Sequence, residues 1–128
     1  MPTPSPLAIA TQAVQRLVKE ETYYQKELAQ QSAKVAKLEA ELKQAGSETS
    51  QDGNAEFILK QEQKAIQETS AVFPSLRTRI SDAVARLEEQ IATAESEDSN
   101  ATELEKAREA LRLGKSVESN AEEKALAA

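Results

Sequence analysis

Residues 7–45 have the sequence LAIATQAVQRLVKEETYYQKELAQQSAKVAKLEAELKQA. Positions separated alternately by three and four residues form one repeat along this stretch. Ten of its twelve positions are apolar, and only Glu21 and Gln31 are polar. The twelve are Leu7, Ala10, Val14, Leu17, Glu21, Tyr24, Leu28, Gln31, Val35, Leu38, Leu42 and Ala45. A repeat of this length predicts one helix that buries a narrow stripe against other helices. Because a helix of about 40 residues is roughly 60 Å long, we expect a chain that presents surface and does not enclose an enzyme core.

A second helix is predicted over residues 55–93. Its apolar stripe consists of Leu59, Ile66, Phe73, Leu76, Ile80, Ala83, Leu87 and Ile91. Proline in a helix interior costs about 3 kcal/mol. The stripe nevertheless continues in register beyond Pro74, so we expect one long helix that is kinked there.

A third helix is predicted over residues 102–113. Thr102 and Glu105 fit a capping box at its start. Its apolar stripe is Leu104, Ala107 and Leu111, and Gly114 is expected to end it. This helix is shorter than the other two, so part of the long pair is expected to stay uncovered.

Together these segments predict an all-α protein, an antiparallel three-helix bundle with coiled-coil-like packing over residues 7–113. Residues 1–6 are expected to be disordered, with Ser5 as the N-cap of the first helix and Pro6 in its first turn. Gly46 is expected to end the first helix, and Asp52-Gly53 to form a turn in the loop that follows. Residues 114–128 are expected to fray.

The composition excludes several classes of function. The 128 residues are 30% charged and only 3% aromatic, which is typical of helical bundles. The absence of Cys and His removes the thiolate nucleophile, the zinc finger and the commonest general base, so no catalytic, metal or cofactor site is predicted. The net charge of −6 argues against nucleic acid as a partner. No stretch has the length of a membrane span and the N-terminus has no signal-peptide pattern, so a cytoplasmic protein is expected.

Several segments resemble the tubulin-binding cofactor A family. Val14-Gln-Arg-Leu-Val-Lys-Glu20, Tyr24-Gln-Lys-Glu27 and Gln30-Gln31-Ser-Ala-Lys34 are similar to its first helix. Phe57 with Leu59-Lys60, Ile66-Gln67-Glu68 and Val72-Phe73-Pro74 are similar to its second. Leu104-Glu-Lys-Ala-Arg108 and Leu111 are similar to its third, so the resemblance covers roughly residues 7–111. The chain departs from the family at Ala8 and Ala10, where the family tends to be basic, and in its longer first loop.

The resemblance implies a three-helix bundle that acts as a tubulin-folding cofactor. Members take up β-tubulin after its release from the cytosolic chaperonin and hold it for assembly of the heterodimer. They use no nucleotide, metal or catalytic residue. By resemblance, then, the expected partner is β-tubulin, and the expected location is the cytoplasm with its tubulin and microtubules.

The sequence leaves two interpretations open for the polar stripe residues Glu21 and Gln31, and two for Tyr23. Glu21 and Gln31 either set the register of the helices, as polar seam residues commonly do, or mark where the bundle opens onto its client. Tyr23 and Tyr24 point about 100° apart on a helix. Tyr24 lies in the stripe and is expected in the core, whereas Tyr23 is either an exposed aromatic anchor or packs on Phe57 or the third helix.

The predicted contact surface is a set of charged residues together with Tyr23. Each residue taken alone could be an ordinary solvated surface residue. For contact with an acidic client such as β-tubulin, the Lys and Arg positions are favoured over the others. The set is Lys19, Glu20, Tyr23, Lys26, Glu27, Lys34, Lys37, Lys60, Lys64, Arg77 and Arg79.

A second hypothesis is a structural coiled-coil adaptor that self-associates through the long stripe or scaffolds helical partners. The two hypotheses differ in oligomeric state. The cofactor is expected to be a monomer or weak homodimer, and the adaptor an oligomer whose size depends on concentration.

Overall fold

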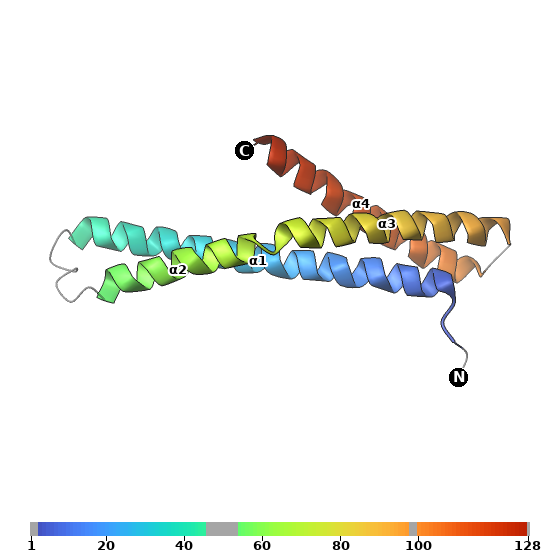
Figure 1. Ribbon diagram of the computed structural model, residues 1–128, viewed down its shortest axis with the longest axis horizontal. Helices are drawn as coiled ribbons and strands as arrows, with labels where there is room; N and C mark the ends of the chain where they lie inside the picture. Colours follow the sequence, from blue (N-terminus) through green and yellow to red (C-terminus); the bar gives the residue numbers. More distant parts are fainter. Residues whose placement is uncertain (1–2, 46–53, 98–99, 128) are drawn as a thin grey trace. The chain divides into compact units, whose positions relative to one another are not determined.

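The computed structural model describes residues 3–45, 54–97 and 100–127, with side chains for 3–44, 54–97 and 100–120. The described residues form four helices, which Figure 1 shows: α1 (Pro6–Ala45), α2 (Asn54–Ser70), α3 (Phe73–Ser96) and α4 (Ala101–Ala127). No strand occurs in those ranges, which confirms the predicted all-α class. The predicted stop at Gly46 and the turn at Asp52-Gly53 lie outside the described residues.

The chain divides into two compact units. The three-helix unit consists of Met1–Glu21 and Pro74–Ala128, and therefore holds the first part of α1 with α3 and α4. The two-helix unit is Thr22–Phe73, the rest of α1 with α2.

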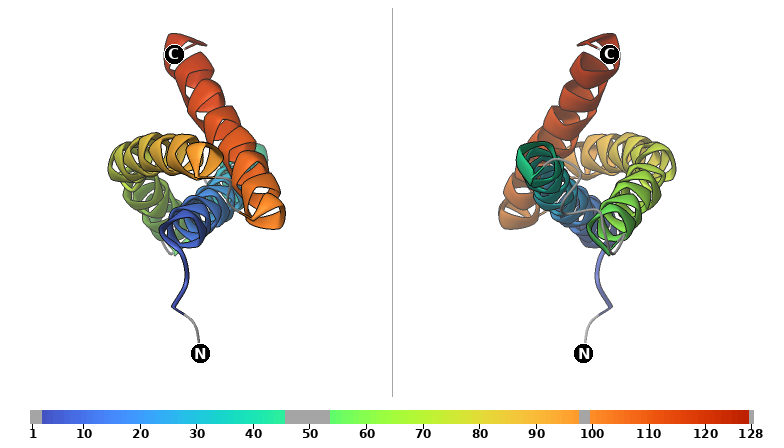
Figure 2. Two further views of the ribbon diagram at one scale, coloured as in Figure 1. Left: turned by 90° about the vertical axis from the view of Figure 1, so that its right-hand side faces the viewer. Right: turned by 90° about the vertical axis from the view of Figure 1, so that its left-hand side faces the viewer.

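In the three-helix unit, α3 runs against the direction of α1, and α4 runs with α1. The Ser5 hydroxyl near the start of α1 donates a hydrogen bond to Glu103 in the first turn of α4, at 3.1 Å. Glu20, further along α1, pairs with Arg79 near the start of α3, at 3.6 Å. The left-hand view of Figure 2 looks onto the end of this unit where α1 and α4 begin and α3 ends.

Two helix starts are capped by side chains, one of them as predicted. Ser5 is the N-cap of α1, because its hydroxyl accepts a hydrogen bond from the Ala8 amide at 3.0 Å. At α4 the cap is Asn100 and not Thr102. The Asn100 side-chain oxygen accepts hydrogen bonds from the amides of Thr102 at 2.8 Å and Glu103 at 3.4 Å. The cap lies two residues before the predicted one because Asn, as effective a cap as Ser, accepts the hydrogen bonds of these amides.

The helix predicted to be continuous over residues 55–93 is two helices, so the prediction of one helix kinked at Pro74 is wrong. α2 ends at Ser70, Ala71 and Val72 form a turn, and α3 begins at Phe73. A proline ring clashes with the carbonyl four residues before it, which here belongs to Ser70. Pro74 instead occupies the first turn of α3, where the missing N–H would have had no helical partner.

The predicted helix end at Gly114 is also wrong, because α4 continues to Ala127. Gly114 is buried in the middle of α4. A Cβ built on it would lie 2.7 Å from Val84 Cγ2 of α3 and 3.0 Å from Val14 Cγ1 of α1. The residue therefore lets three helix backbones approach closely and does not terminate a helix. One residue later, Lys115 pairs with Glu88 of α3 at 3.7 Å, so α4 still contacts α3 at this point.

The apolar core belongs almost entirely to the three-helix unit. Its buried apolar residues are Leu7, Ala10, Val14, Leu17, Leu76, Ile80, Val84, Leu87, Ile91, Ala94, Leu104, Ala107 and Ala110. Two predicted positions are displaced by one residue: Val84 is buried where Ala83 was expected, and Ala110 where Leu111 was expected. Small residues on α4 again accommodate a close approach of the helices.

The two-helix unit pairs α1 with α2 in opposite directions. The rings of Tyr24 and Phe73 meet edge to face, with centroids 6.4 Å apart. Further along, Lys34 of α1 pairs with Glu62 of α2 at 2.9 Å. Among the described residues of this unit, Phe73 is the one fully buried apolar side chain. The remaining stripe residues are half-buried, namely Leu28, Val35, Leu38, Leu42, Leu59 and Ile66. Two helices alone leave such a stripe partly exposed.

Candidate partner-binding surface

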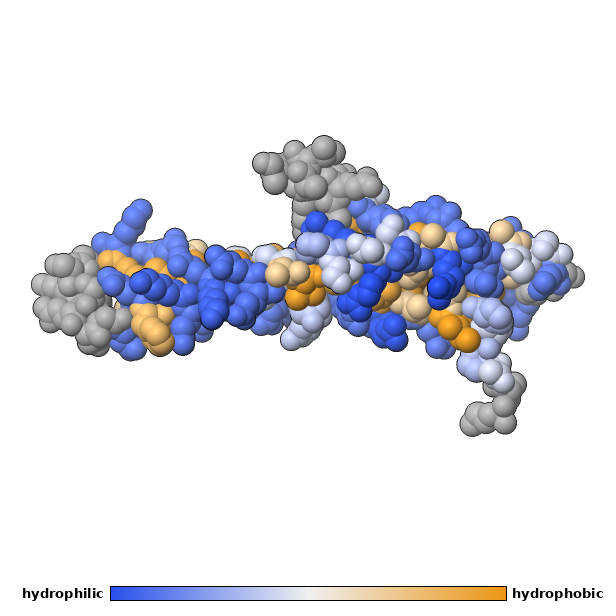
Figure 3. Space-filling view, in the orientation of Figure 1, coloured by the Kyte–Doolittle hydropathy of each residue, from blue (hydrophilic) through white to orange (hydrophobic). Residues whose placement is uncertain are grey.

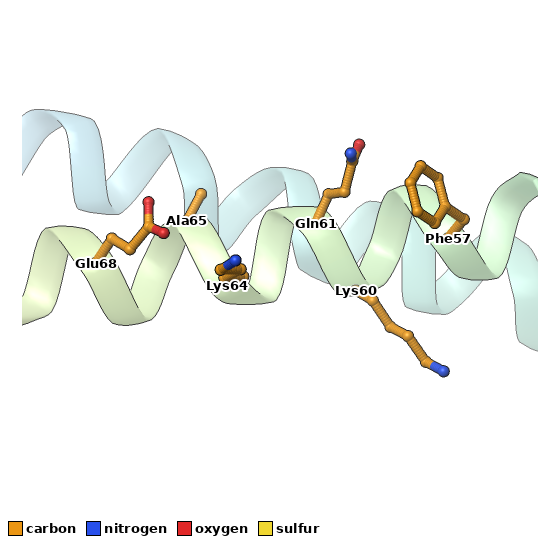
Figure 4. A pocket seen from close by; sticks show the side chains of 6 residues that line it. All are labelled: Phe57, Lys60, Gln61, Lys64, Ala65 and Glu68. Atoms are coloured by element: carbon orange, nitrogen blue, oxygen red, sulfur yellow. The ribbon is translucent and has the colours of Figure 1, made fainter.

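Six residues of α2 line a shallow hollow on the two-helix unit (Figure 4). They follow one another at spacings of one, three and four residues, which places them on one broad face of the helix. We call this set the α2 outer face: Phe57, Lys60, Gln61, Lys64, Ala65 and Glu68.

The α2 outer face points away from α1. Glu62 of α2 pairs with Lys34 of α1, and Gln63 donates a hydrogen bond to Glu39 at 3.4 Å; both residues lie outside this set. In Figure 4, α1 passes behind α2, Phe57 and Gln61 project to one side, and the Lys60 side chain extends to the other. The face is therefore open to a partner along its length.

Phe57 is the residue of this surface that sequence reasoning missed as a contact. Its side chain is 60% exposed. Exposed aromatic rings are costly to leave in water and are enriched where proteins bind one another. One signal was present in the sequence, since Phe57 lies two positions before the stripe residue Leu59 and so points to the opposite side of a helix.

The charges along the α2 outer face change from one end to the other. Lys60 and Lys64 are exposed, and neither forms an ion pair within the part of the chain that the structure describes. Glu68 follows one turn after Lys64. The face therefore presents an aromatic ring at its N-terminal end, two cations in the middle and a carboxylate at its C-terminal end. Figure 3 shows apolar patches among hydrophilic surface over this two-helix part of the chain.

The predicted contact residues divide between the two units. Lys19, Glu20, Arg77 and Arg79 belong to the three-helix unit, where the Glu20–Arg79 pair joins two of them. The seven in the two-helix unit are Tyr23, Lys26, Glu27, Lys34, Lys37, Lys60 and Lys64. Of these, only Lys60 and Lys64 line the same hollow.

The remaining predicted residues of the two-helix unit have varied surroundings. Lys34 is held by Glu62, while Lys26 and Lys37 are exposed. The side chain of Gln31, a polar stripe residue, donates a hydrogen bond to Glu27 at 3.5 Å. Both residues belong to α1, so this contact lies within one helix. Among the predicted cations of this unit, Lys60 and Lys64 are thus distinguished by lining one hollow together with Phe57.

Tyr23 is the more exposed of the two tyrosines, whereas Tyr24 is not fully in the core, where it was expected. Tyr23 is 60% exposed, and its ring meets that of Tyr24 edge to face at 5.2 Å. Tyr24 is half-buried and contacts Phe73 as well. Glu21, the last residue of the three-helix unit, is 7% exposed, which suits a polar seam residue that sets register better than one that contacts a client.

No three His, Cys, Asp or Glu residues among the described side chains gather closely enough to hold a metal ion. No described helix has the length and apolar character to cross a bilayer. What the α2 outer face can do chemically is bind: it combines an aromatic ring with two positive charges on a shallow, open surface.

Comparisons with known proteins give a consistent result. Residues 2–111 match the sequence model of the family described as tubulin binding cofactor A. The chain is 33% identical to the tubulin-specific chaperone A of Saccharomyces cerevisiae over 91 residues, which are 70% of this chain and 76% of that protein. It is 32% identical to the tubulin-specific chaperone A of Mus musculus over 102 residues, 80% of this chain and 83% of that protein. The Oryctolagus cuniculus protein of the same name matches equally well. No solved structure matches the chain significantly.

Proposed function

The chain belongs to the tubulin binding cofactor A family, and on this premise we propose that it is a tubulin-folding cofactor. In this proposal it captures β-tubulin released from the cytosolic chaperonin and holds it, without chemistry, until the α/β heterodimer is assembled. The place of action is the cytoplasm.

The observation that carries this proposal is the family match over residues 2–111, which includes all of α1, α2 and α3 and the first part of α4. The relatives that match are named as tubulin-specific chaperones. The surfaces of the helices agree with a binding role, because the charged side chains project outward from both units and an aromatic ring is exposed on α2.

Binding is proposed to use the outward-facing helix surfaces of an antiparallel bundle. The predicted contact residues, with their preponderance of Lys and Arg, suit an acidic client despite the net charge of −6. The protein is proposed to act as a monomer or weak homodimer, with no nucleotide, metal or other cofactor.

The test is a size-exclusion binding assay with newly folded β-tubulin. α-Tubulin and the intact heterodimer serve as controls, and circular dichroism first establishes that the chain is folded. We expect a stable complex with β-tubulin alone. A folded chain that forms no complex with any of the three would refute the proposal.

A structural coiled-coil adaptor is the second candidate function. The half-buried stripe of the two-helix unit favours it, since a second copy could cover these apolar residues. Sedimentation equilibrium separates the two. A mass between 13.9 kDa and that of a dimer supports the cofactor, and growth in mass beyond a dimer as concentration rises supports the adaptor.

A further inference from the structure

We propose that the α2 outer face is the docking surface for an acidic amphipathic segment of the protein partner, in which an apolar residue meets Phe57 and two carboxylates meet Lys60 and Lys64. This inference deepens the proposed function, on which it rests for the identity of the partner. It names the contact surface on this chain and the chemistry of the segment that fits it.

The charge of this face selects an acidic partner. Several cations elsewhere are already paired: Lys34 with Glu62 at 2.9 Å, and Arg79 with Glu20 at 3.6 Å. Lys60 and Lys64, in contrast, have no ion pair among the described residues. An incoming carboxylate would gain an interaction with either ammonium group without first breaking a pair within this chain. Complementary charges of this kind guide association and exclude partners of the same sign.

The aromatic ring supplies the apolar part of the contact. Phe57 is 60% exposed, so a partner can still bury much of a large ring. Aromatic anchors surrounded by polar contacts are typical of the residues that dominate binding energy. The long aliphatic stems of Lys60 and Lys64 add further apolar surface beside the ring.

The order of the groups also constrains the partner. From Phe57 to Glu68 the helix rises by roughly 16 Å, which a partner helix covers with about 11 residues. A matching segment therefore carries an apolar residue at one end, two acidic residues in the middle and a basic residue opposite Glu68. Recognition of an amphipathic helix through residues at such helical spacings is a common mode of binding.

Anionic lipids and nucleic acids also bind lysines, but the structure favours a protein segment. Two cations followed by a carboxylate make a poor surface for a continuous array of negative charge. The shallow hollow around an exposed aromatic ring instead suits a side chain of matching shape.

Three variants test the assignment in the full chain. Phe57→Ala removes the ring, and the double variant Lys60→Glu/Lys64→Glu reverses the two charges. The matched control, Lys43→Glu/Lys106→Glu, makes the same charge change at two exposed lysines outside the predicted contact set. Circular dichroism confirms that each variant is folded, as expected for changes at exposed positions.

Each variant is measured against two probes. The first is β-tubulin, in the size-exclusion assay. The second is a designed, dye-labelled helical peptide of about 15 residues with one Leu, two Glu and one Lys at the matching spacings, followed by fluorescence anisotropy. A peptide with Lys in place of both Glu, and vesicles rich in phosphatidylserine, serve as comparison ligands.

We expect Phe57→Ala and Lys60→Glu/Lys64→Glu each to weaken binding of both probes by about tenfold or more, and the control double variant to change it by less than about twofold. Equal losses in the control variant, or no loss in the α2 variants, would overturn the assignment. Binding of the vesicles or of the Lys peptide in preference to the Glu peptide would also overturn it. If wild-type protein fails to capture β-tubulin, the proposed function fails, and the peptide measurements still decide whether this face docks an acidic segment.

Discussion

Gly114 of α4 lies so close to Val84 of α3 that a Cβ built on the glycine would be 2.7 Å from Val84 Cγ2, shorter than real contacts between such atoms. Val14 Cγ1 of α1 lies 3.0 Å from the same point. All three residues are buried. The absence of a side chain at Gly114 therefore determines how closely the three helices of this unit can pack.

Gly114→Ala is expected to lower the free energy of unfolding. An alanine gains about 1 kcal/mol over glycine in a helix interior, but overpacking a close contact costs about 1–3 kcal/mol. Because the branched side chains of Val84 and Val14 are stiff, we expect a net loss of about 1 kcal/mol in urea unfolding. The exposed Ser116→Ala is the control and should change stability by less than about 0.5 kcal/mol. A gain in stability for Gly114→Ala would mean that the helices part easily.

Asn100→Ala is expected to destabilise the protein by about 1 kcal/mol, because it removes the oxygen that accepts hydrogen bonds from two amides at the start of α4. Thr102→Ala is the matched control, since Thr102 was the cap that the sequence predicted. It should be nearly neutral. Thermal unfolding of the two variants compares them directly, and a larger loss for Thr102→Ala would show that the helix starts at the later residue.

Pro74→Ala is expected to change stability by less than about 1 kcal/mol and to leave the helical content unchanged. In a continuous kinked helix, replacing the proline would restore a hydrogen bond in the helix interior and raise stability. Pro74 lies in the first turn of α3, so no interior hydrogen bond is restored when it is replaced. Circular dichroism and urea unfolding measure both quantities. A gain of several kcal/mol would instead indicate that α2 and α3 join into one helix once the ring is gone.

The carboxylate of Glu109 should titrate below its usual range. A hydrogen bond from Arg112 lowers the pKa of Glu109, slight desolvation opposes this, and the charge of Arg112 lowers it further. A depressed folded-state pKa means that the pair stabilises the fold above the pKa of the unfolded chain and loses this effect as pH falls through the folded value. Since both groups are exposed, the effect on stability should be small. An NMR titration should show the pKa of Glu109 rising toward its usual value in Arg112→Gln.

The sequence predicted some helices better than others for identifiable physical reasons. The bounds of α1 follow from an uninterrupted repeat, and its first buried residues, Leu7, Ala10, Val14 and Leu17, lie where the repeat puts them. Gly114 could not be interpreted from the sequence, because a glycine that ends a helix and one that allows close packing look alike until Val84 and Val14 are known to lie beside it.

The remaining differences also depend on tertiary neighbours. The apolar spacing continued across Pro74, which concealed the two-residue turn before it. For the candidate site, the sequence predicted Lys60 and Lys64 but missed Phe57. Phe57 lies opposite the stripe residue Leu59 on the helix, so the sequence indicates its exposure, but the hollow that joins it to the two lysines becomes visible only in the folded structure.

Stability should be distributed unevenly between the two units, and paired substitutions of one residue type can show it. Leu87 of α3 is 0% exposed in the three-helix unit, whereas Leu59 of α2 is half-buried. Leu87→Ala is expected to cost about 2–5 kcal/mol, because it removes buried contacts and leaves a cavity. Leu59→Ala should cost about 1–2 kcal/mol, since its side chain is still partly in water.

Native-state hydrogen exchange supplies the second measurement of this prediction. Amides of α2 should exchange through local opening well below the global free energy of unfolding, and those of α3 only near it. Leu59→Ala should accelerate exchange in α2 and leave α3 nearly unchanged. Equal protection of α2 and α3 would contradict the prediction and indicate that contacts beyond the two-helix stripe hold α2 in place. A partner seated on the α2 outer face should raise the protection of α2 selectively, because binding stabilises the state that binds.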